Sequence, residues 1–334
     1  MPPASGVGAA RAVALDRLRG VALVAMLVHH LVDWSTGDAR AVLPGWRAFS
    51  VTDAAAVMFF VAAGASMALF VGSRRGRGLS HGHVGAQILR RYGLLVPIGM
   101  ALDWVLWRDP LMCGVLEVLG VTVVLGAAVA SAVPARALPV VAAAVVWGGV
   151  WSEQAVAGRA GWWSTELIGG KFPLVTYLGF VLVGVAAVRC GWFADRRKVA
   201  AAAGAALLVT LALLADGLVP DRYPGDVHFV VPGLAVTIAV YALAQLRWVA
   251  VLAGLDRVVR QAAAHTLGIF LAHYALYALL RRAGLLGDVP GGVAVPAAII
   301  VTVVLCLVAP RVPLSWSLRT GRRGPVSRRQ DLRS

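Results

Sequence analysis

The sequence predicts an all-α integral membrane protein, a polytopic bundle of about ten transmembrane helices. The 334 residues are 60% hydrophobic and 14% charged, with a mean hydropathy of +0.80. A soluble domain is nearer half apolar and a quarter charged. Apolar runs of about 20 residues, the length that crosses a bilayer, recur along the chain. These runs are continuous and do not alternate with polar residues, which favours helices over barrel strands.

Ten apolar spans can be drawn in order along the chain, and they form a single domain over residues 1–310. The first run carries two histidines and an aspartate and lacks a small-residue cleavage site, so we interpret it as a membrane span and not as a signal peptide. Residues 246–262 are expected to hold a short interfacial helix, and the basic tail 311–334 is expected to be disordered. The spans are 17–36, 52–72, 88–107, 111–132, 136–152, 172–190, 199–216, 227–246, 262–280 and 291–310.

The net charge of +15 reflects clusters of Lys and Arg between the apolar runs. When the linkers are assigned alternately to two sides, one side holds 23 of the 31 basic residues and the other holds 8. Basic linkers face the cytoplasm, so both termini are predicted to be cytoplasmic in a multi-pass protein of the cell (inner or plasma) membrane. This arrangement argues against nucleic acid as a partner and predicts contacts with anionic membrane lipid.

The first span contains the costliest set of polar groups in the chain. Arg19 and His30 are eleven residues apart, about 20° from a whole number of helical turns, so they share a face at levels roughly 16 Å apart. His29 lies about 80° away from that face. Asp33 follows the two histidines by three and four residues and can reach either imidazole.

Ionisable groups inside a membrane are candidates for function. A cation at the cytoplasmic rim and a base deeper in the membrane suit an elongated ligand with an anionic end. A neutral imidazole is a suitable general base, and a nearby carboxylate would fix its tautomer. The alternative is that His29 and His30 only hydrogen-bond between helices, and the residues alone leave both readings open.

The pattern Leu15-Asp16-x-Leu18-Arg19-Gly20 followed by His30 resembles the opening motif of the acyltransferase-3 proteins, where ten residues separate an arginine and a histidine. The same stretch also resembles the heparan-α-glucosaminide N-acetyltransferase catalytic domain, within the transmembrane acyltransferase superfamily. The second likeness continues through later segments and covers residues 13–280. Its segments are Trp46 to Ser66, Arg90-Arg91, Gly114-Val115-Leu116-Glu117, Phe172-Pro173 with Leu178-Gly179-Phe180, and His265 to His273.

The resemblance implies transfer of an acyl group, acetyl in the lysosomal members, from cytoplasmic acyl-CoA to an acceptor across the membrane. Those members acetylate a glucosamine amine, and bacterial relatives modify envelope glycans. The lysosomal enzymes carry asparagine at the position of His30 and a histidine near the position of Leu43. The base therefore matches the acyltransferase-3 branch better, and the choice between an amine and a hydroxyl acceptor stays open.

Other candidates complete the predicted site, each with a structural alternative. Asp53 either orients the base or acceptor, or caps a helix. Arg90 and Arg91 either hold CoA phosphates with Arg19 at a helix N-terminus or anchor the span. Glu117, about two turns into its run, is expected to pair with a histidine or arginine. Substrate or tunnel roles are assigned to His29, Glu117, Arg222 and His273, although interhelical hydrogen bonding would equally explain His273.

We therefore predict an acyl-CoA-dependent acyltransferase in which His30 is the base, Asp33 or Asp53 orients it, and Arg19 with Arg90 or Arg91 binds the donor. Cys113, Cys190 and Cys306 lack metal-ligand spacing, so no metal is expected. A homodimer is compatible with the sequence. The rival readings are a proton-coupled transporter or flippase of a small or lipid-linked substrate and a non-catalytic membrane scaffold.

Overall fold

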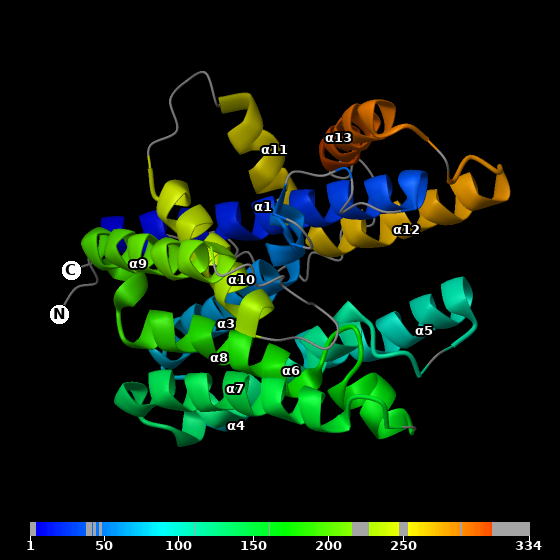
Figure 1. The fold of residues 1–334 in the computed structure, drawn as a ribbon. Coiled ribbons are helices and arrows are strands. Elements are labelled where there is room, and N and C mark those ends of the chain that lie inside the picture. Colours follow the sequence, from blue (N-terminus) through cyan, green and yellow to red (C-terminus); the bar gives the residue numbers. More distant parts are fainter. Residues whose placement is uncertain are drawn as a thin grey trace, which may run out of the picture.

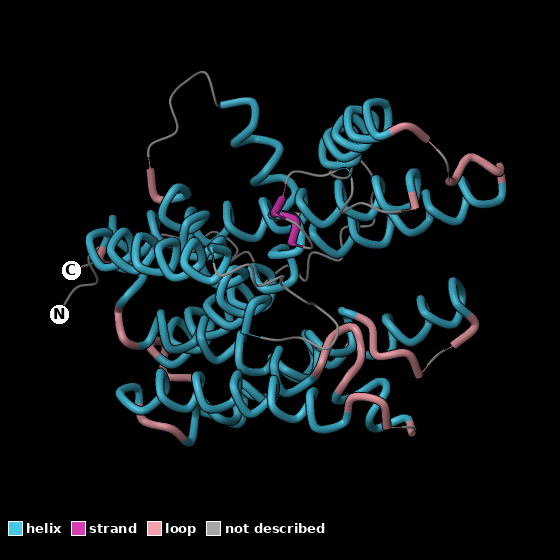
Figure 2. Tube along the Cα trace, viewed as in Figure 1, coloured by secondary structure: helices cyan, strands magenta, loops and turns pink. Residues whose placement is uncertain are grey.

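The structure, a computed structural model, describes a helical protein (Figures 1 and 2). The described residues are 5–37, 42, 45–46, 49–109, 111–159, 161–215, 227–246, 253–287 and 289–308. Their only strands are a two-residue antiparallel pair, β1 (Gly45–Trp46) and β2 (Phe49–Ser50). The α-helices are α1 (Ser5–Thr36), α3 (Ala54–Arg75), α4 (His81–Gly93), α5 (Leu95–Trp107), α6 (Val115–Ala132), α7 (Leu138–Val156), α8 (Leu174–Arg189), α9 (Arg196–Ala215), α10 (Val227–Ala244), α11 (Ala253–Ala264), α12 (Thr266–Arg282) and α13 (Gly291–Val308).

Helix α1 separates two groups of helices (Figure 1). On one side it contacts α3 and α10, behind which lie α8 and α7. On the other side it contacts α11, α12 and α13. The polar groups of α1 therefore face partners from both ends of the chain, and the candidate site is built around this helix.

The centre of the larger group is a close crossing of α3 and α8. A Cβ atom at Gly64 would lie 2.0 Å from the carbonyl oxygen of Val181, and one at Gly184 would lie 2.0 Å from that of Val61. Each glycine thus lets the other helix approach, as small residues do between membrane helices. Around this crossing lies the main apolar core, which includes the fully buried Phe180. The crossing fixes α3, which supplies several partners of α1.

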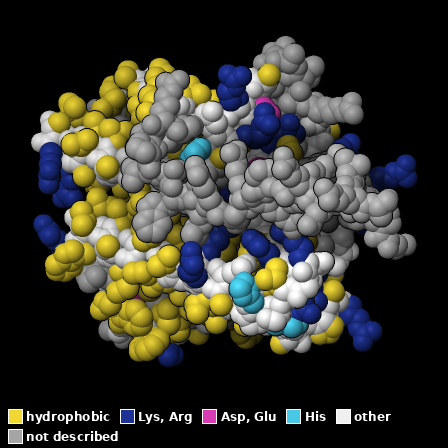
Figure 3. Space-filling view, turned by 180° about the vertical axis from the view of Figure 1, so that it is seen from behind, with side chains coloured by type: hydrophobic (Ala, Val, Ile, Leu, Met, Phe, Trp, Pro, Cys, Tyr) yellow, Lys and Arg dark blue, Asp and Glu magenta, His cyan; other side chains and the backbone are white. Residues whose placement is uncertain are grey.

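Four described helical segments are long and apolar enough to cross a membrane: Ala54–Arg75, Val115–Ala132, Ala135–Val156 and Gly291–Val308. The bent pair α11 and α12 adds a fifth if it counts as one span, and Leu174–Arg189 and Phe229–Ala244 are shorter apolar helices. Hydrophobic side chains cover the left part of the face in Figure 3, whereas most visible Lys and Arg lie elsewhere on it. The all-helical membrane class is confirmed. The count of ten spans and the cytoplasmic termini stay predictions, and the tail 311–334 lies outside the described residues.

Two predicted spans are interrupted. The span predicted at 88–107 is divided, because α4 ends at Gly93 and α5 begins at Leu95. Pro97 explains the break, since it lacks the N–H that would bond to the carbonyl of Gly93 and its ring clashes with that carbonyl. The span predicted at 262–280 bends by 91° between α11 and α12. The short helix expected over 246–262 corresponds to α11, which lies a few residues later.

Candidate active site

The two histidines that the sequence singled out on α1 and α12 lie in contact. The Nδ1 atom of His30 is 3.1 Å from the Nε2 atom of His273. Their rings are stacked, with centroids 5.4 Å apart. The two residues are 243 positions apart in sequence, so the contact joins the first helix to the C-terminal part of the chain.

The hydrogen bonds around His273 determine the tautomer of His30. The Nδ1 atom of His273 is hydrogen-bonded to the backbone carbonyl of Phe270. A carbonyl oxygen only accepts, so Nδ1 of His273 carries the hydrogen and donates it. His273 is 0% exposed, and burial of a charged imidazole without a counter-ion is costly, so its Nε2 holds a lone pair.

It follows that Nδ1 of His30 donates to Nε2 of His273. Neutral imidazole carries one N–H, so the lone pair of His30 resides on Nε2. This chain of bonds presents His30 in a form that accepts a proton at a defined atom. The sequence-based expectation was that a carboxylate would set this tautomer, whereas the described contact is with a second histidine.

An aromatic wall surrounds the histidine pair. Trp34 stacks on His273 at a centroid distance of 5.5 Å and an interplanar angle of 9°, and it also stacks on His30 at 5.6 Å. Tyr277 lies 4.4 Å from Trp34, and Trp107 of α5 lies 5.7 Å from Tyr277. His30 remains half-buried, in contrast to His273. Stacking restricts both imidazole rings, which favours a fixed orientation for the base.

His29 and Asp53 meet the start of α3. The Nδ1 atom of His29 is 2.9 Å from the hydroxyl oxygen of Thr52. Asp53 precedes α3, but its side chain makes no capping hydrogen bond to that helix and is 3% exposed. Asp53 therefore occupies the N-cap position of α3, as the capping alternative expected, but without the side-chain hydrogen bond of a cap. Asp33 is exposed on α1, and its role in orienting the base stays a prediction, as does that of Asp53.

Arg19 faces the middle of α3. Its guanidinium lies 2.9 Å from the carboxylate of Asp16 and 3.2 Å from the hydroxyl of Ser66. Arg17, two residues earlier, instead forms a 2.7 Å ion pair with Asp256 of α11. The two arginines therefore contact different helices. Arg17 holds α11 against α1, whereas Arg19 is half-buried between α1 and α3. The role of Arg19 in binding the donor stays a prediction.

Four predicted site residues are placed differently from the expectation or lie outside the described residues. Arg90 and Arg91 are exposed in the last turn of α4, whereas the expectation placed them at the start of a helix; the next helix, α5, begins only at Leu95. Arg222 lies outside the described residues. Glu117 is in the first turn of α6, not two turns into its run.

The partner of Glu117 also differs from the expectation. Its carboxyl group lies beside that of Asp103 on α5: a Cβ atom at Gly114 would be 2.9 Å from one and 2.8 Å from the other. Asp103 and Glu117 are 7% and 8% exposed, and both border Gly114. Two adjacent buried carboxylate anions repel each other, which favours protonation of one member of the pair. The pair closes the turn between α5 and α6.

Several polar contacts had no signal in the sequence. The hydroxyls of Thr52 and Ser66 meet His29 and Arg19, and nothing in their surroundings distinguishes them from other small polar residues. Glu153, expected in a loop, is 1% exposed on α7 and accepts a hydrogen bond from Thr176. The one feature of the sequence that could have indicated a buried Glu153 is its position directly after an apolar run.

Among the described residues, no group of three or more His, Cys, Asp or Glu residues could hold a metal ion.

These features define a helical membrane protein with a histidine pair inside the bundle. The sequence pattern of the family described as heparan-alpha-glucosaminide N-acetyltransferase, catalytic, matches residues 11–217. The chain belongs to this family, which confirms the family resemblance seen in the sequence and indicates a membrane acetyltransferase-type enzyme with acetyl-CoA as the donor of the class. Comparison with curated proteins gives no match. The matched region contains α1 and α3 but ends before His273.

Proposed function

We propose that the protein transfers an acyl group, acetyl in the simplest case, from cytoplasmic acyl-CoA to a hydroxyl or amine of an envelope glycan or other extracytoplasmic acceptor. The observation that carries this proposal is the bond sequence from His30 through His273 to the carbonyl of Phe270. That sequence leaves the lone pair on Nε2 of His30, which is what a general base requires.

In the proposed reaction, the acceptor oxygen or neutral nitrogen attacks the thioester carbonyl while Nε2 of His30 takes the acceptor's proton. The tetrahedral intermediate then collapses, the carbon–sulfur bond breaks, and the imidazolium returns the proton to the sulfur. The products are free CoA and the acylated acceptor. Direct transfer is favoured over an acyl-enzyme, since neither sequence neighbour of His30 is a serine or a cysteine.

Arg19 is the proposed binding residue for a CoA phosphate. It is half-buried and keeps guanidinium donors beyond those used with Asp16 and Ser66, because arginine has five. Its separation from His30 along α1, roughly 16 Å by helical rise, matches a donor with its phosphates distant from its thioester. Arg90 and Arg91 are exposed and would act as surface charges that attract the anionic donor.

The scaffold alternative is best supported at His273, which is fully buried, and less well at His30, which is half-buried. A histidine kept only for interhelical bonding is expected to be fully buried, whereas a general base has to be reached by its substrate. The exposure of His30 therefore favours catalysis.

The test uses purified protein, labelled acetyl-CoA and two acceptors: glucosamine, which offers an amine, and methyl glucoside, which offers only hydroxyls. Under the proposal His30→Ala lowers transfer by about 10²–10⁴-fold, the usual contribution of a general base. The matched control is His83→Ala, an exposed histidine that hydrogen-bonds Gln87 on α4. Transfer by His30→Ala at the rate of the His83→Ala control would exclude His30 as the base.

A further inference from the structure

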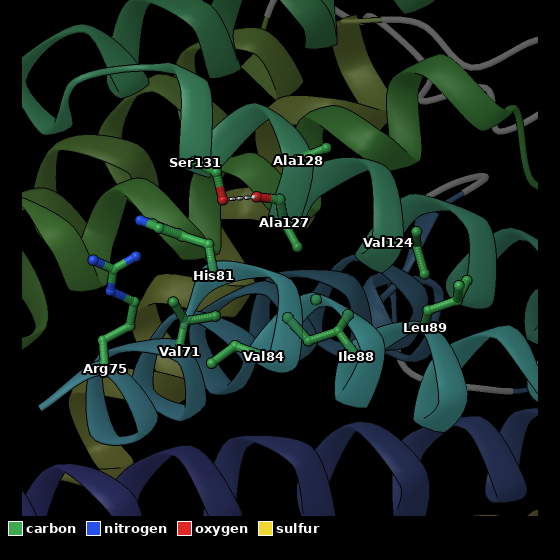
Figure 4. Close-up of a pocket in the computed structure, with 11 residues that line it drawn as sticks. Val71, Arg75, His81, Val84, Ile88, Leu89, Val124, Ala127, Ala128 and Ser131 are labelled. Atoms are coloured by element: carbon green, nitrogen blue, oxygen red, sulfur yellow. Dashed lines mark hydrogen bonds between the residues drawn. The ribbon is translucent and has the colours of Figure 1, made fainter. Parts of the chain in front are cut away.

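A groove separate from the histidine pair lies between α3, α4 and α6 (Figure 4). Its volume is about 260 Å³. The groove is lined by the last turn of α3, by one face of α4 and by the C-terminal half of α6. Helices α3 and α6 are both long enough to span a membrane, so the groove lies where two spans end against the amphipathic helix α4.

The lining of this groove changes character from one end to the other. Arg75 and His81 lie together at one end in Figure 4, and the apolar side chains continue away from them toward Leu89. The apolar wall is formed by Val84, Ile88, Val124 and Ala128. A ligand that matches this surface has an anionic group at one end and a hydrocarbon chain at the other.

Arg75 differs from the neighbouring arginines Arg74 and Arg77 in what its guanidinium contacts. Arg74 lies over the ring of Phe70 at 5.1 Å, and Arg77 donates to the hydroxyl of Ser73 at 2.8 Å. Arg75 is exposed and, within the described part of the chain, forms no ion pair or hydrogen bond through its guanidinium. The positive charge of Arg75 is therefore available to a ligand and lies at one end of the apolar groove.

The size of the groove excludes the acyl-CoA donor as its whole occupant. Pockets that enclose a drug-sized molecule have volumes of about 300–1,000 Å³, and CoA is larger than such a molecule. None of the residues in the groove contacts His30 or His273. The elongated apolar lining suits part of a single hydrocarbon chain, whose CH₂ groups leave water when they are buried there.

We propose that this groove binds one anionic phospholipid, with the phosphate at Arg75 and His81 and one acyl chain along Val84, Ile88 and Val124. Helix α4 supports this assignment because its last turn carries the exposed Arg90 and Arg91, while Val84 and Ile88 earlier in the helix are buried. Such basic amphipathic helices lie in the membrane interface and attract anionic lipid. The site requires only that the chain is embedded in a membrane, and it is independent of the reaction proposed above.

The experiment measures lipid binding to the purified full chain by native mass spectrometry. The two probes are phosphatidylglycerol and phosphatidylcholine with identical acyl chains. The wild-type protein is expected to bind one phosphatidylglycerol more tightly than phosphatidylcholine. Arg75→Gln should weaken phosphatidylglycerol binding roughly fivefold, as expected for one basic residue near an anionic surface, and should leave phosphatidylcholine unaffected.

Two matched controls separate this site from general effects. Arg74→Gln removes the same charge one residue away and should not change binding. Ala128→Phe fills the groove and should abolish binding of both lipids, whereas Leu125→Phe, on the same helix but outside the groove, should not. The exposed position of Arg75 keeps Arg75→Gln informative if Ala128→Phe fails to fold.

Three results would overturn the assignment. The first is equal phosphatidylglycerol affinity for Arg75→Gln and Arg74→Gln. The second is equal wild-type affinity for the two lipids. The third is displacement of phosphatidylglycerol by acyl-CoA, which would assign the groove to the donor instead.

Discussion

Substitution of His273 tests whether the histidine pair orients the base. Leu at position 273 fills a similar buried space but offers no acceptor to Nδ1 of His30. His30 then loses one hydrogen bond, with a net value of about 0.5–1.5 kcal/mol. The expected loss in kcat/KM is therefore roughly 2–12-fold, well below the loss expected for His30→Ala. Gln at the same position carries an oxygen that can accept from His30 and should restore kcat/KM to within about twofold of wild type.

The assay is the initial rate of transfer from labelled acetyl-CoA, with kcat and KM determined separately. Histidine-selective ¹⁵N spectra provide a second readout, because they report which nitrogen of His30 carries hydrogen. His273→Leu should mix the two tautomers of His30, whereas His273→Gln should retain the one with hydrogen on Nδ1. If His273→Leu keeps the wild-type rate, or if His273→Gln is as impaired as His273→Leu, then His273 does not orient His30 by selecting its tautomer.

Three further predictions concern binding, packing and thiol chemistry. Arg19→Ala should raise the KM for acetyl-CoA by about tenfold or more, as expected for a lost hydrogen bond to a charged group; an unchanged KM, as expected for the exposed Arg136→Ala control, would exclude the proposed phosphate contact. Gly20→Ala places a Cβ 1.9 Å from the carbonyl oxygen of Val259, so it should lower stability by about 3 kcal/mol. Thermal unfolding should show this loss, whereas Gly72→Ala, which meets nothing within 4 Å, should be neutral or stabilising; equal stability of the two variants would contradict the close packing of α1 on α11. Burial, with smaller contributions from Glu166, Glu117 and Asp103, raises the pKa of the Cys113 thiol to about 11. Because only the thiolate reacts, alkylation of Cys113 in a Cys190→Ser, Cys306→Ser background should be slow at pH 8 and rise about tenfold per pH unit up to that pKa; rapid alkylation at pH 8 would contradict the burial.

The sequence predicted the helical membrane class and the polar residues of α1, because hydrophobic runs and buried charge are local signals. It did not show which helix lies opposite each residue. Helical periodicity placed His30 on a face of α1, but the partner on that face, His273, depends on the crossing of α1 and α12. The contacts of Thr52 with His29 and of Ser66 with Arg19 were missed for the same reason. The role of a small hydroxyl residue depends on which side chain the fold places next to it.

The errors at helix boundaries have local causes. The expected span over 88–107 did not allow for Pro97, which ends α4 four residues earlier and so places Arg90 and Arg91 in the last turn of a helix. Glu117 was placed too deep because residues 112–114 are not helical and α6 begins only at Val115. The bend between Ala264 and Thr266 carries no proline, and no pattern in the sequence predicts it.

The 243 residues between His30 and His273 also bear on how the protein is made. At ribosomal rates of 5–20 residues per second, about 12–50 s separate the synthesis of the two histidines. Under the predicted topology α1 is in the membrane during that interval without α11, α12 or α13, and α3 and α10 are the first of its partner helices to be made. In that topology α1 has to insert into the membrane through its own hydrophobicity, before α12 has been synthesised. The histidine pair can form only after nearly the whole chain has left the ribosome.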